Sequence, residues 1–153
     1  MKLVKFFAML LMAASMAFLF TACSSDDDKD GDDGDAQVTT TFSDLVDTGS
    51  ALTFSYTQTV GGMSVVTTET YGYSGTAITS HTTVTEYPSA NIATEAKNEL
   101  EKDAEVMQDI DNISVSGKNM TITYKASTYA DMTKEMITTI YQIMKENAKN
   151  DKK

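Results

Sequence analysis

Apolar and polar residues alternate from residue 52 onward in the manner of β-strands. In residues 52–57 every second side chain is Leu, Phe or Tyr, and Thr or Ser stands between them. This period of two predicts a half-buried strand. Two adjacent glycines mark a hairpin turn before a second alternating run over residues 63–71, and a Ser-Gly pair precedes a third strand over residues 76–87, which Pro88 ends. The three runs predict an antiparallel meander.

After the proline, the apolar residues recur every three or four positions. Residues 89–108 carry Ala, Leu and Met at this spacing with Glu and Lys between them. This pattern predicts an amphipathic helix with Ser89 or Asn91 as its N-cap. Alternation returns over residues 113–124 around Gly117 and predicts a second hairpin.

A last helix is predicted over residues 130–148. Thr128 and Asp131 resemble a capping arrangement at its start, with Asp in place of the usual Glu or Gln. The apolar face of this helix consists of seven residues: Met132, Met136, Ile137, Ile140, Tyr141, Ile143 and Met144. Its methionines at helical spacing indicate core packing, although Met-rich grooves also serve as binding surfaces.

The order β-β-β-α-β-β-α predicts an α+β fold in two layers, a five-stranded antiparallel sheet with both helices on one face. The other face is expected to be Thr-rich and open to solvent, as antiparallel sheets often are. Residues 36–50 leave two interpretations open. Residues 38–42 fit an added edge strand, and Phe42, Leu45 and Val46 fit a clasp against the sheet.

The first 22 residues have the pattern of a signal peptide. Two lysines precede an apolar stretch over residues 6–20, and small residues lead to Cys23, the only cysteine of the chain. The stretch is shorter than the roughly 20 residues that a spanning helix needs. Residues 20–23 resemble a lipobox with Phe in place of the usual Leu. This resemblance implies cleavage before Cys23 and acylation of its sulfur, which anchors the chain in a membrane; a free thiol is the alternative.

An acidic segment follows the cysteine. Residues 26–35 contain seven Asp, one Lys and two Gly, with no apolar side chain, which predicts an extended, solvated linker. The expected organisation is a signal peptide at 1–22, a disordered acidic tether at 23–40, a single α+β domain at 41–149 and a frayed tail at 150–153.

The first residues of this segment are similar to the surface-export signal of Bacteroidota lipoproteins. The residues that carry the similarity are Ser24, Ser25, Asp26, Asp27 and Asp28. The similarity implies a lipid-anchored protein of the outer membrane that faces the cell exterior. Part of the same run also matches the first half of an EF-hand loop, but Gln37 stands where the bidentate Glu is required. We therefore expect no specific Ca²⁺ site.

Charge and residue types exclude several function classes. The chain has a formal net charge of −10 and no arginine, so it lacks the positive footprint of a nucleic-acid-binding protein. His81 is the only histidine, and no nucleophile motif or phosphate-cradling loop followed by Lys is present. We interpret His81 as an exposed or partly packed strand residue, and we expect no enzyme, no cofactor and no metal site.

Two further groups of residues have competing interpretations. The carboxylates of the first helix indicate a solvated face rather than a pair of catalytic acids, namely Glu95, Glu99, Glu101, Asp103 and Glu105. Several of the seven tyrosines fall on strands. A Tyr- and Thr-rich sheet face would bind a glycan or peptide, but amphipathic roles at the edge of the core are favoured.

Three patterns occur in a fixed order: residues 67–75, residues 82–87 leading into Glu95-Ala96-Lys97, and residues 121–124 followed by 129–132. In these patterns the stretch 52–144 resembles the YehR-like family of small bacterial lipoproteins, a domain of unknown function. The resemblance implies the same two-layer α+β fold and no particular activity or site residue. The chain departs from the family in its long acidic tether and its many methionines.

The sequence therefore predicts a non-enzymatic lipoprotein of the cell envelope. Its expected partners are the membrane, through the lipid on Cys23, and a protein or glycan on the exposed sheet face. A small envelope hydrolase and an accessory subunit of a larger envelope complex are the alternatives. An exposed aromatic patch on the open sheet face favours binding there, whereas a pocket with converging acid, base or nucleophile groups favours the hydrolase.

Overall fold

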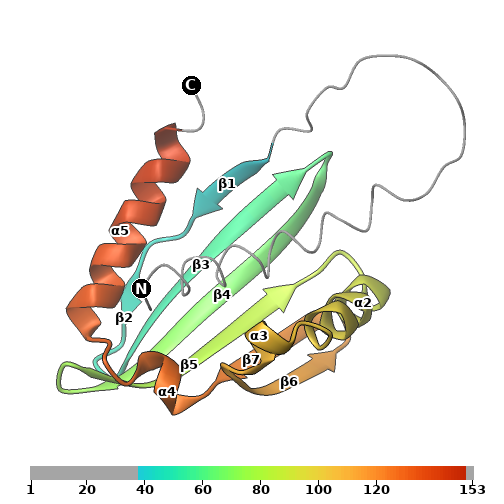
Figure 1. The fold of residues 1–153 in the computed structure, drawn as a ribbon. Coiled ribbons are helices and arrows are strands. Elements are labelled where there is room, and N and C mark those ends of the chain that lie inside the picture. The colour runs from blue at the N-terminus through green and yellow to red at the C-terminus, as the bar shows by residue number, and fades with distance from the viewer. Residues whose placement is uncertain (1–37, 151–153) are drawn as a thin grey trace, which may run out of the picture.

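The computed structural model of this chain describes residues 38–150 (Figure 1). The predicted signal peptide at 1–22, Cys23, the export signal at 24–28 and nearly all of the tether lie outside the described residues. In the described part, seven strands form a single antiparallel sheet in the order β1-β3-β4-β5-β7-β6, and β2 also pairs with β3. The strands are β1 (Thr39–Phe42), β2 (Val46–Asp47), β3 (Ala51–Val60), β4 (Met63–Ser74), β5 (Ala77–Glu86), β6 (Ile110–Ser116) and β7 (Asn119–Tyr124).

The α+β class and the antiparallel sheet are confirmed, but the count of five strands is wrong. The two added strands, β1 and β2, both pair with β3, and β1 begins at Thr39, within the range expected for the tether. Strand β1 confirms the added edge strand that residues 38–42 fit. Phe42 and Leu45 also pack against the core, as the clasp interpretation expected, whereas Val46 is 54% exposed. Strand β2 has two residues, too few for alternation to reveal it. Both strands form because the ten-residue β3 offers a free edge along its whole length, and an unpaired edge readily accepts another strand.

The first predicted helix is divided into α2 (Ala90–Leu100) and α3 (Ala104–Met107). Ser89 caps α2, because its side chain accepts a hydrogen bond from the Ile92 N–H. The Asp103 carboxylate accepts hydrogen bonds from the backbone N–H groups of Glu105 and Val106. A cap of this kind starts a new helix rather than continuing the old one.

The last predicted helix is likewise divided, into α4 (Ala126–Tyr129) and α5 (Lys134–Asn150). The predicted capping role of Thr128 and Asp131 is wrong. The Thr128 hydroxyl donates to the Lys125 carbonyl, and Thr133 Oγ1 accepts the Met136 N–H at the start of α5. Ile143, assigned to the apolar face, is 46% exposed. The two-helix prediction thus gives way to two longer helices and two single turns among residues 38–150.

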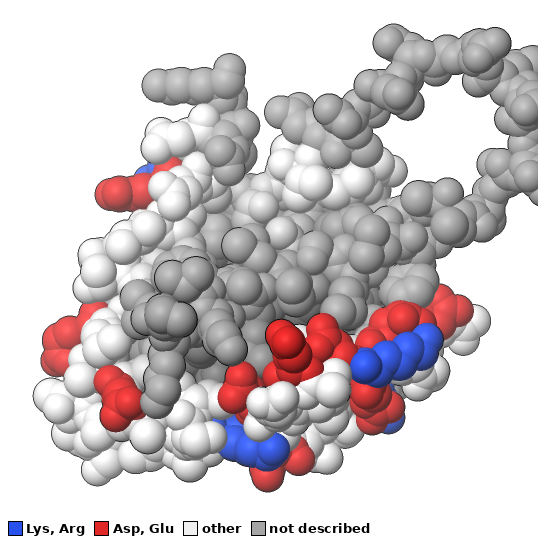
Figure 2. Space-filling model, in the orientation of Figure 1, with Lys and Arg blue, Asp and Glu red and all other residues white. Residues whose placement is uncertain are grey.

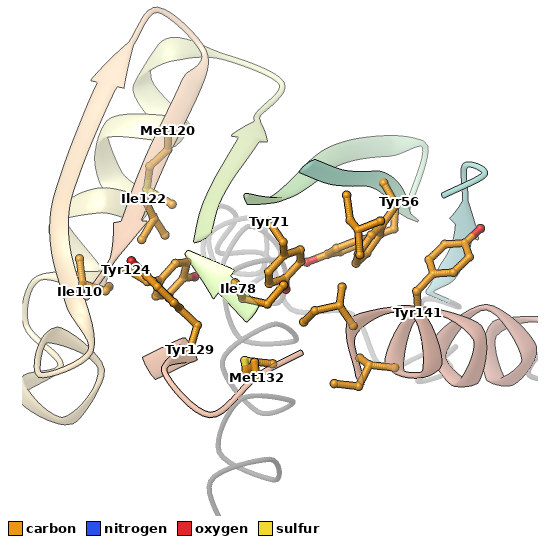
Figure 3. Close-up of a cluster of buried hydrophobic side chains, with 14 of the residues drawn as sticks. Tyr56, Tyr71, Ile78, Ile110, Met120, Ile122, Tyr124, Tyr129, Met132 and Tyr141 are labelled. Carbon is orange, nitrogen blue, oxygen red and sulfur yellow. The ribbon is translucent and has the colours of Figure 1, made fainter. Parts of the chain in front are cut away.

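Helices α2 and α5 lie over opposite ends of the sheet, with β4 and β5 between them (Figure 1). Helix α2 contacts β6 and β7, and α5 contacts β1. On the α5 side the Tyr141 ring lies 5.1 Å from the Phe54 ring of β3, and its hydroxyl donates to the Ser43 carbonyl at 2.6 Å. Figure 3 shows part of the buried core, in which Met120 and Ile122 lie at one end and Tyr141 at the other.

The opposite face of the sheet carries Thr and Ser along every long strand and is half-buried or exposed. Hydroxyls pair across neighbouring strands, as between Ser55 Oγ and Thr68 Oγ1 at 2.7 Å. We call this surface the open face. Its Thr-rich character is as predicted from the alternation, although most of its threonines are half-buried rather than fully exposed.

The two faces of β7 are buried to different degrees, and this difference gives a test of the fold. Ile122 is 1% exposed and belongs to the core, whereas the adjacent Thr121 is half-buried on the open face. We expect Ile122→Ala to lower the free energy of unfolding by about 2–5 kcal/mol, because it leaves a cavity. Thr121→Ala should cost less than about 1 kcal/mol. Urea denaturation of both variants measures this, and equal losses would contradict the assigned faces.

Candidate functional site

The covered face of the sheet is polar in its middle. On the two central strands, β4 and β5, five buried residues on the helix side are polar or charged: Thr67, Glu69, His81, Thr83 and Thr85. We call these five residues the central stripe. They lie on adjacent strands in register, because Glu69 pairs with Thr83 and Thr67 pairs with Thr85.

Apolar residues flank the central stripe on both sides. In the row through Glu69 and Thr83, the next residue on β3 is Phe54 and the next on β7 is Ile122. In the row through Thr67 and Thr85, the flanking residues are Tyr56 and Met120. Each row is therefore apolar or aromatic at the ends, where α5 and α2 lie, and polar in the middle.

The Glu69 carboxylate is the centre of the stripe. His81 Nε2 lies 2.8 Å from Glu69 Oε2, and the Thr83 hydroxyl donates to the same oxygen at 2.7 Å. The side chains of Glu69 and His81 are each 1% exposed. A carboxylate at this depth is strongly disfavoured unless hydrogen bonds replace its lost hydration. His81 and Thr83 supply these bonds, both from β5.

A stack of three rings holds the imidazole in place. Tyr71 of β4 and Tyr124 of β7 lie on either side of His81, with ring centroids 4.2 Å away in both cases and interplanar angles of 9° and 8°. The spacing is close to the distance between neighbouring strands, since the three residues stand on adjacent strands. The stack fixes the ring plane of His81 so that Nε2 faces Glu69.

The interpretation of His81 as exposed or partly packed is wrong. Alternation along residues 76–87 places His81 on the same side as Thr79 and Thr83. His81 does share its side with the buried Thr83, but the pairing of β4 with β5 shifts between Gly72 and Tyr73. Ile78 and His81 are both buried as a result, and Thr79 is exposed. A Cβ on Gly72 would lie 2.3 Å from Ser80 Oγ, so a residue without a side chain permits this close approach.

Gln58 extends the polar surface onto β3. It is 7% exposed and lies on the helix side, two residues beyond Tyr56. Its Oε1 atom is buried and has no hydrogen-bond partner among the described residues. A buried amide oxygen without a donor lowers the stability of the folded state. Gln58 Oε1 is thus an acceptor whose hydrogen-bonding capacity the described residues do not use.

Protonated tyrosines surround the stripe. Burial raises the pKa of Tyr56, Tyr71 and Tyr124, and the negative charge of Glu69 raises it further. Burial alone raises the pKa of Tyr87 to about 12. At neutral pH these hydroxyls are therefore neutral groups that both donate and accept hydrogen bonds.

The tyrosines do not form an aromatic surface on the open face. Six of them belong to the buried core, namely Tyr56, Tyr71, Tyr87, Tyr124, Tyr129 and Tyr141, and Tyr73 packs against that core. The aromatic patch that would favour ligand binding on the open face is thus absent among the described residues. The polar and aromatic groups that come together are on the covered face.

Helix α5, which covers one end of the sheet, is held by two lysines. Lys134 Nζ lies 2.5 Å from Asp47 Oδ2 and 4.5 Å from the centre of the Tyr73 ring. Lys145 Nζ lies 2.7 Å from Asp44 Oδ1 and contacts the Tyr141 hydroxyl at 2.8 Å. Hydrogen bonds from Lys134, Tyr73 and the Gly49 backbone lower the pKa of Asp47 to about 2.

The helix carboxylates do not converge. Lys97 pairs with Glu101 at 2.9 Å, and Lys102 pairs with Glu99. Figure 2 shows acidic and basic side chains close together over the region that α2 and α3 occupy in Figure 1. Within residues 38–150, no three His, Cys, Asp or Glu side chains come together as metal ligands would. None of the described helices is long and apolar enough to span a membrane.

No family model, curated protein or solved structure matches the chain. The resemblance to the YehR-like family therefore stays a prediction. The central stripe and its surroundings are therefore the features of the described chain that bear on its function.

The raised tyrosine pKa values predict the response to alkali. A group whose pKa is higher in the folded state gives stability that is complete below its unfolded pKa and is lost as the pH rises through the folded pKa. For Tyr87 this window runs from 10.0 to about 12. We expect tyrosinate absorbance from the buried tyrosines to appear together with unfolding, as followed by circular dichroism. Complete titration near pH 10 in a chain that stays folded would contradict the burial.

Proposed function

We propose that the chain is a lipid-anchored protein of the cell envelope, whose folded domain is a non-catalytic binding module that takes its ligand on the central stripe. The observation that carries the proposal is the polar middle of an otherwise apolar face. In many proteins, replacing a buried ion pair with apolar residues of similar volume leaves the stability unchanged or raises it. Stability alone therefore does not explain why Glu69, His81 and the buried threonines occupy this face. Buried polar groups that a protein retains in its core, even where they also fix a strand register, are frequent at functional sites.

The geometry favours binding over hydrolysis. A hydroxyl nucleophile needs a base that accepts its proton through a hydrogen bond. The Thr83 hydroxyl instead donates to Glu69, and His81 Nε2 faces the same carboxylate oxygen. Each group satisfies the others, so the cluster is a fixed, buried hydrogen-bond network rather than an activated nucleophile. We therefore prefer a binding module to a small hydrolase.

The envelope assignment rests on the sequence. Cys23 after an apolar leader and the residues 24–28 of the export signal, two Ser followed by three Asp, support an outer-membrane lipoprotein that faces the exterior. The open face, expected earlier to hold a protein or glycan partner, is mostly Thr and Ser, its Glu86 is paired with Lys118, and it has no aromatic patch among residues 38–150. The covered face, which holds the central stripe, is therefore the candidate site, and an accessory role in a larger envelope complex is the alternative.

Removal of the lipidated sulfur tests the anchor. We expect mass spectrometry of the protein isolated from membranes to find acyl chains on a chain that begins at Cys23, and to find none on the Cys23→Ser variant, because the sulfur that carries them is gone. Ser24→Ala serves as the matched control and should be acylated like the parent chain. An unmodified thiol at Cys23 in the native protein would contradict the anchor.

The single histidine gives a direct test of the binding site. The processed lipoprotein, which begins at Cys23, is purified in detergent with labelled histidine, so that all imidazole NMR signals come from His81. We expect a soluble extract of cell envelopes to shift these signals saturably, because a ligand on the stripe changes the surroundings of the ring. The variant Thr83→Val should abolish most of the shift, and Thr82→Val, on the open face, should preserve it.

Unchanged His81 signals at saturating extract would overturn the binding proposal. A shift that Thr82→Val removes as completely as Thr83→Val would place the site on the wrong face of the sheet. Far-ultraviolet circular dichroism and a urea transition confirm that both variants are folded before the comparison is made.

A further inference from the structure

We infer that β6, the strand at one edge of the sheet, pairs with β6 of a second copy of this chain. The pairing is antiparallel and joins the two sheets into one across a twofold axis. Strand β6 ends the strand order opposite β1, and β7 is its only pairing partner among residues 38–150 (Figure 1). The inference goes beyond the proposed function, because it does not depend on the central stripe.

The backbone of β6 has unused hydrogen-bonding groups at its outer edge. The Tyr87 N–H donates to the Lys118 carbonyl, so the backbone groups of Lys118 and of every second residue after it turn toward β5. The residues between them turn toward β6 and bond to their partners there, one of which is Ser114. The alternate residues of β6, Ile113 and Val115, therefore turn their N–H and C=O groups away from β7, and no described strand pairs with them on that side.

Strand β6 lacks the features that usually prevent edge-to-edge pairing. Exposed edges are commonly protected by Lys, by Pro or by a β-bulge. The shift in register lies before Asn112, and Asp111, the only charged residue of the strand, lies there too. Residues 112–116 contain no charge and no Pro. The opposite edge of the sheet is divided between β1 and β2, which have four and two residues, so β6 is the longer continuous edge of the described fold.

An antiparallel copy of β6 matches the strand position by position. A twofold axis at Ser114 places Ile113 of each copy opposite Val115 of the other, so the unused backbone groups of the two strands face each other. Both residues are half-buried and pack against the core, and their pairing extends the apolar surface on the covered face. On the open face, Ser114 meets its own equivalent and Asn112 meets Ser116, all of which are exposed and uncharged.

The charges near the two ends of the strand are complementary. Asp111 stands near the start of β6, and Lys118 follows its end in the hairpin turn. Antiparallel pairing brings Asp111 of each copy beside Lys118 of the other. Asp111 is exposed, and the Lys118 side chain is 55% exposed although it pairs with Glu86. A parallel arrangement would place like charges together, which is unfavourable. The match of apolar, polar and charged positions favours a second copy over an unrelated extended peptide.

The expected dimer is weak and reversible. One strand pair is a small interface compared with the roughly 1,600 Å² of a standard protein–protein interface. A disulfide at the twofold axis would capture such a dimer. The two copies of Ser114 form a non-hydrogen-bonded pair, in which the Cα atoms lie about 4.5 Å apart. This separation is within the range that a disulfide can bridge.

The test oxidises intact cells that produce the full chain with copper phenanthroline and separates the proteins on a non-reducing gel. We expect Ser114→Cys to give at least about tenfold more disulfide-linked dimer than Ser116→Cys, because the two copies of residue 116 lie about 13 Å apart along the strands. Both serines are exposed on the same face of β6, so the variants are matched. The parent chain measures any background from Cys23, and mass spectrometry identifies the linked peptides.

A pair of cysteines tests the register independently. Residue 112 of one copy lies opposite residue 116 of the other, whereas each lies about 13 Å from its own equivalent. Asn112→Cys and Ser116→Cys should therefore give little dimer as single variants. The double variant should give at least about tenfold more dimer than either, with peptides of residue 112 linked to peptides of residue 116. Circular dichroism and a urea transition of the purified variants show that each is folded like the parent chain.

Three outcomes would overturn the inference. The first is a Ser114→Cys variant that gives no more dimer than the parent chain. The second is equal dimer from Ser114→Cys and Ser116→Cys, which indicates random collision rather than a strand pair. The third is a disulfide from Ser114→Cys to a different protein, which assigns the edge to an extended segment of that protein. None of these outcomes changes the His81 signals, so the binding module is tested separately.

Discussion

The structure depends on keeping one carboxylate, that of Glu69, in the middle of a buried sheet face. Its two hydrogen-bond partners stand on β5, so the carboxylate is satisfied only when β4 and β5 are paired in one register. A slip by one residue would turn every side chain of a strand to the other face. A slip of β5 would turn Thr83 to the open face and bring Thr82, which now lies on the open face, into its place. The Glu69 carboxylate would then stay in the core without its partners. The pair thus fixes register where many interchangeable threonines would not.

The same constraint explains how the sheet is divided. Its ends carry the apolar residues that α2 and α5 cover, including Ile122 at one end and Phe54 at the other. Its centre carries hydroxyls, the imidazole and the carboxylate. The free energy of folding therefore comes mainly from the two flanks, where apolar surface is buried. The middle strands contribute fewer apolar residues to the core, among them Val65, Tyr71 and Ile78, and hold the buried polar groups between them.

Much of this architecture follows from the sequence. Alternation from residue 52 placed Leu52, Phe54 and Tyr56 on one face, and the structure buries all three. The cluster at Glu69 was missed because alternation fixes which face a residue occupies but not its partner on another strand. One signal was present: Glu69 stands on the same side as the buried Val65 and Tyr71. A carboxylate on the apolar side of a strand requires a partner, and His81 was obscured by the extra residue, Thr79, in β5.

If the chain is anchored at its N-terminal end as proposed, the edge strand β1 has a mechanical consequence. A pull on that end would enter the described fold at Thr39, the first residue of β1. Four residues pair this strand with β3, and its last residue, Phe42, contacts the rings of Tyr56 and Tyr141. A pull that detached β1 would remove the contact of Phe42 with Tyr141 of α5, while the contact of Tyr141 with Phe54 of β3 would remain. Load on the anchor and the position of the helix beside the stripe are therefore linked through one short strand.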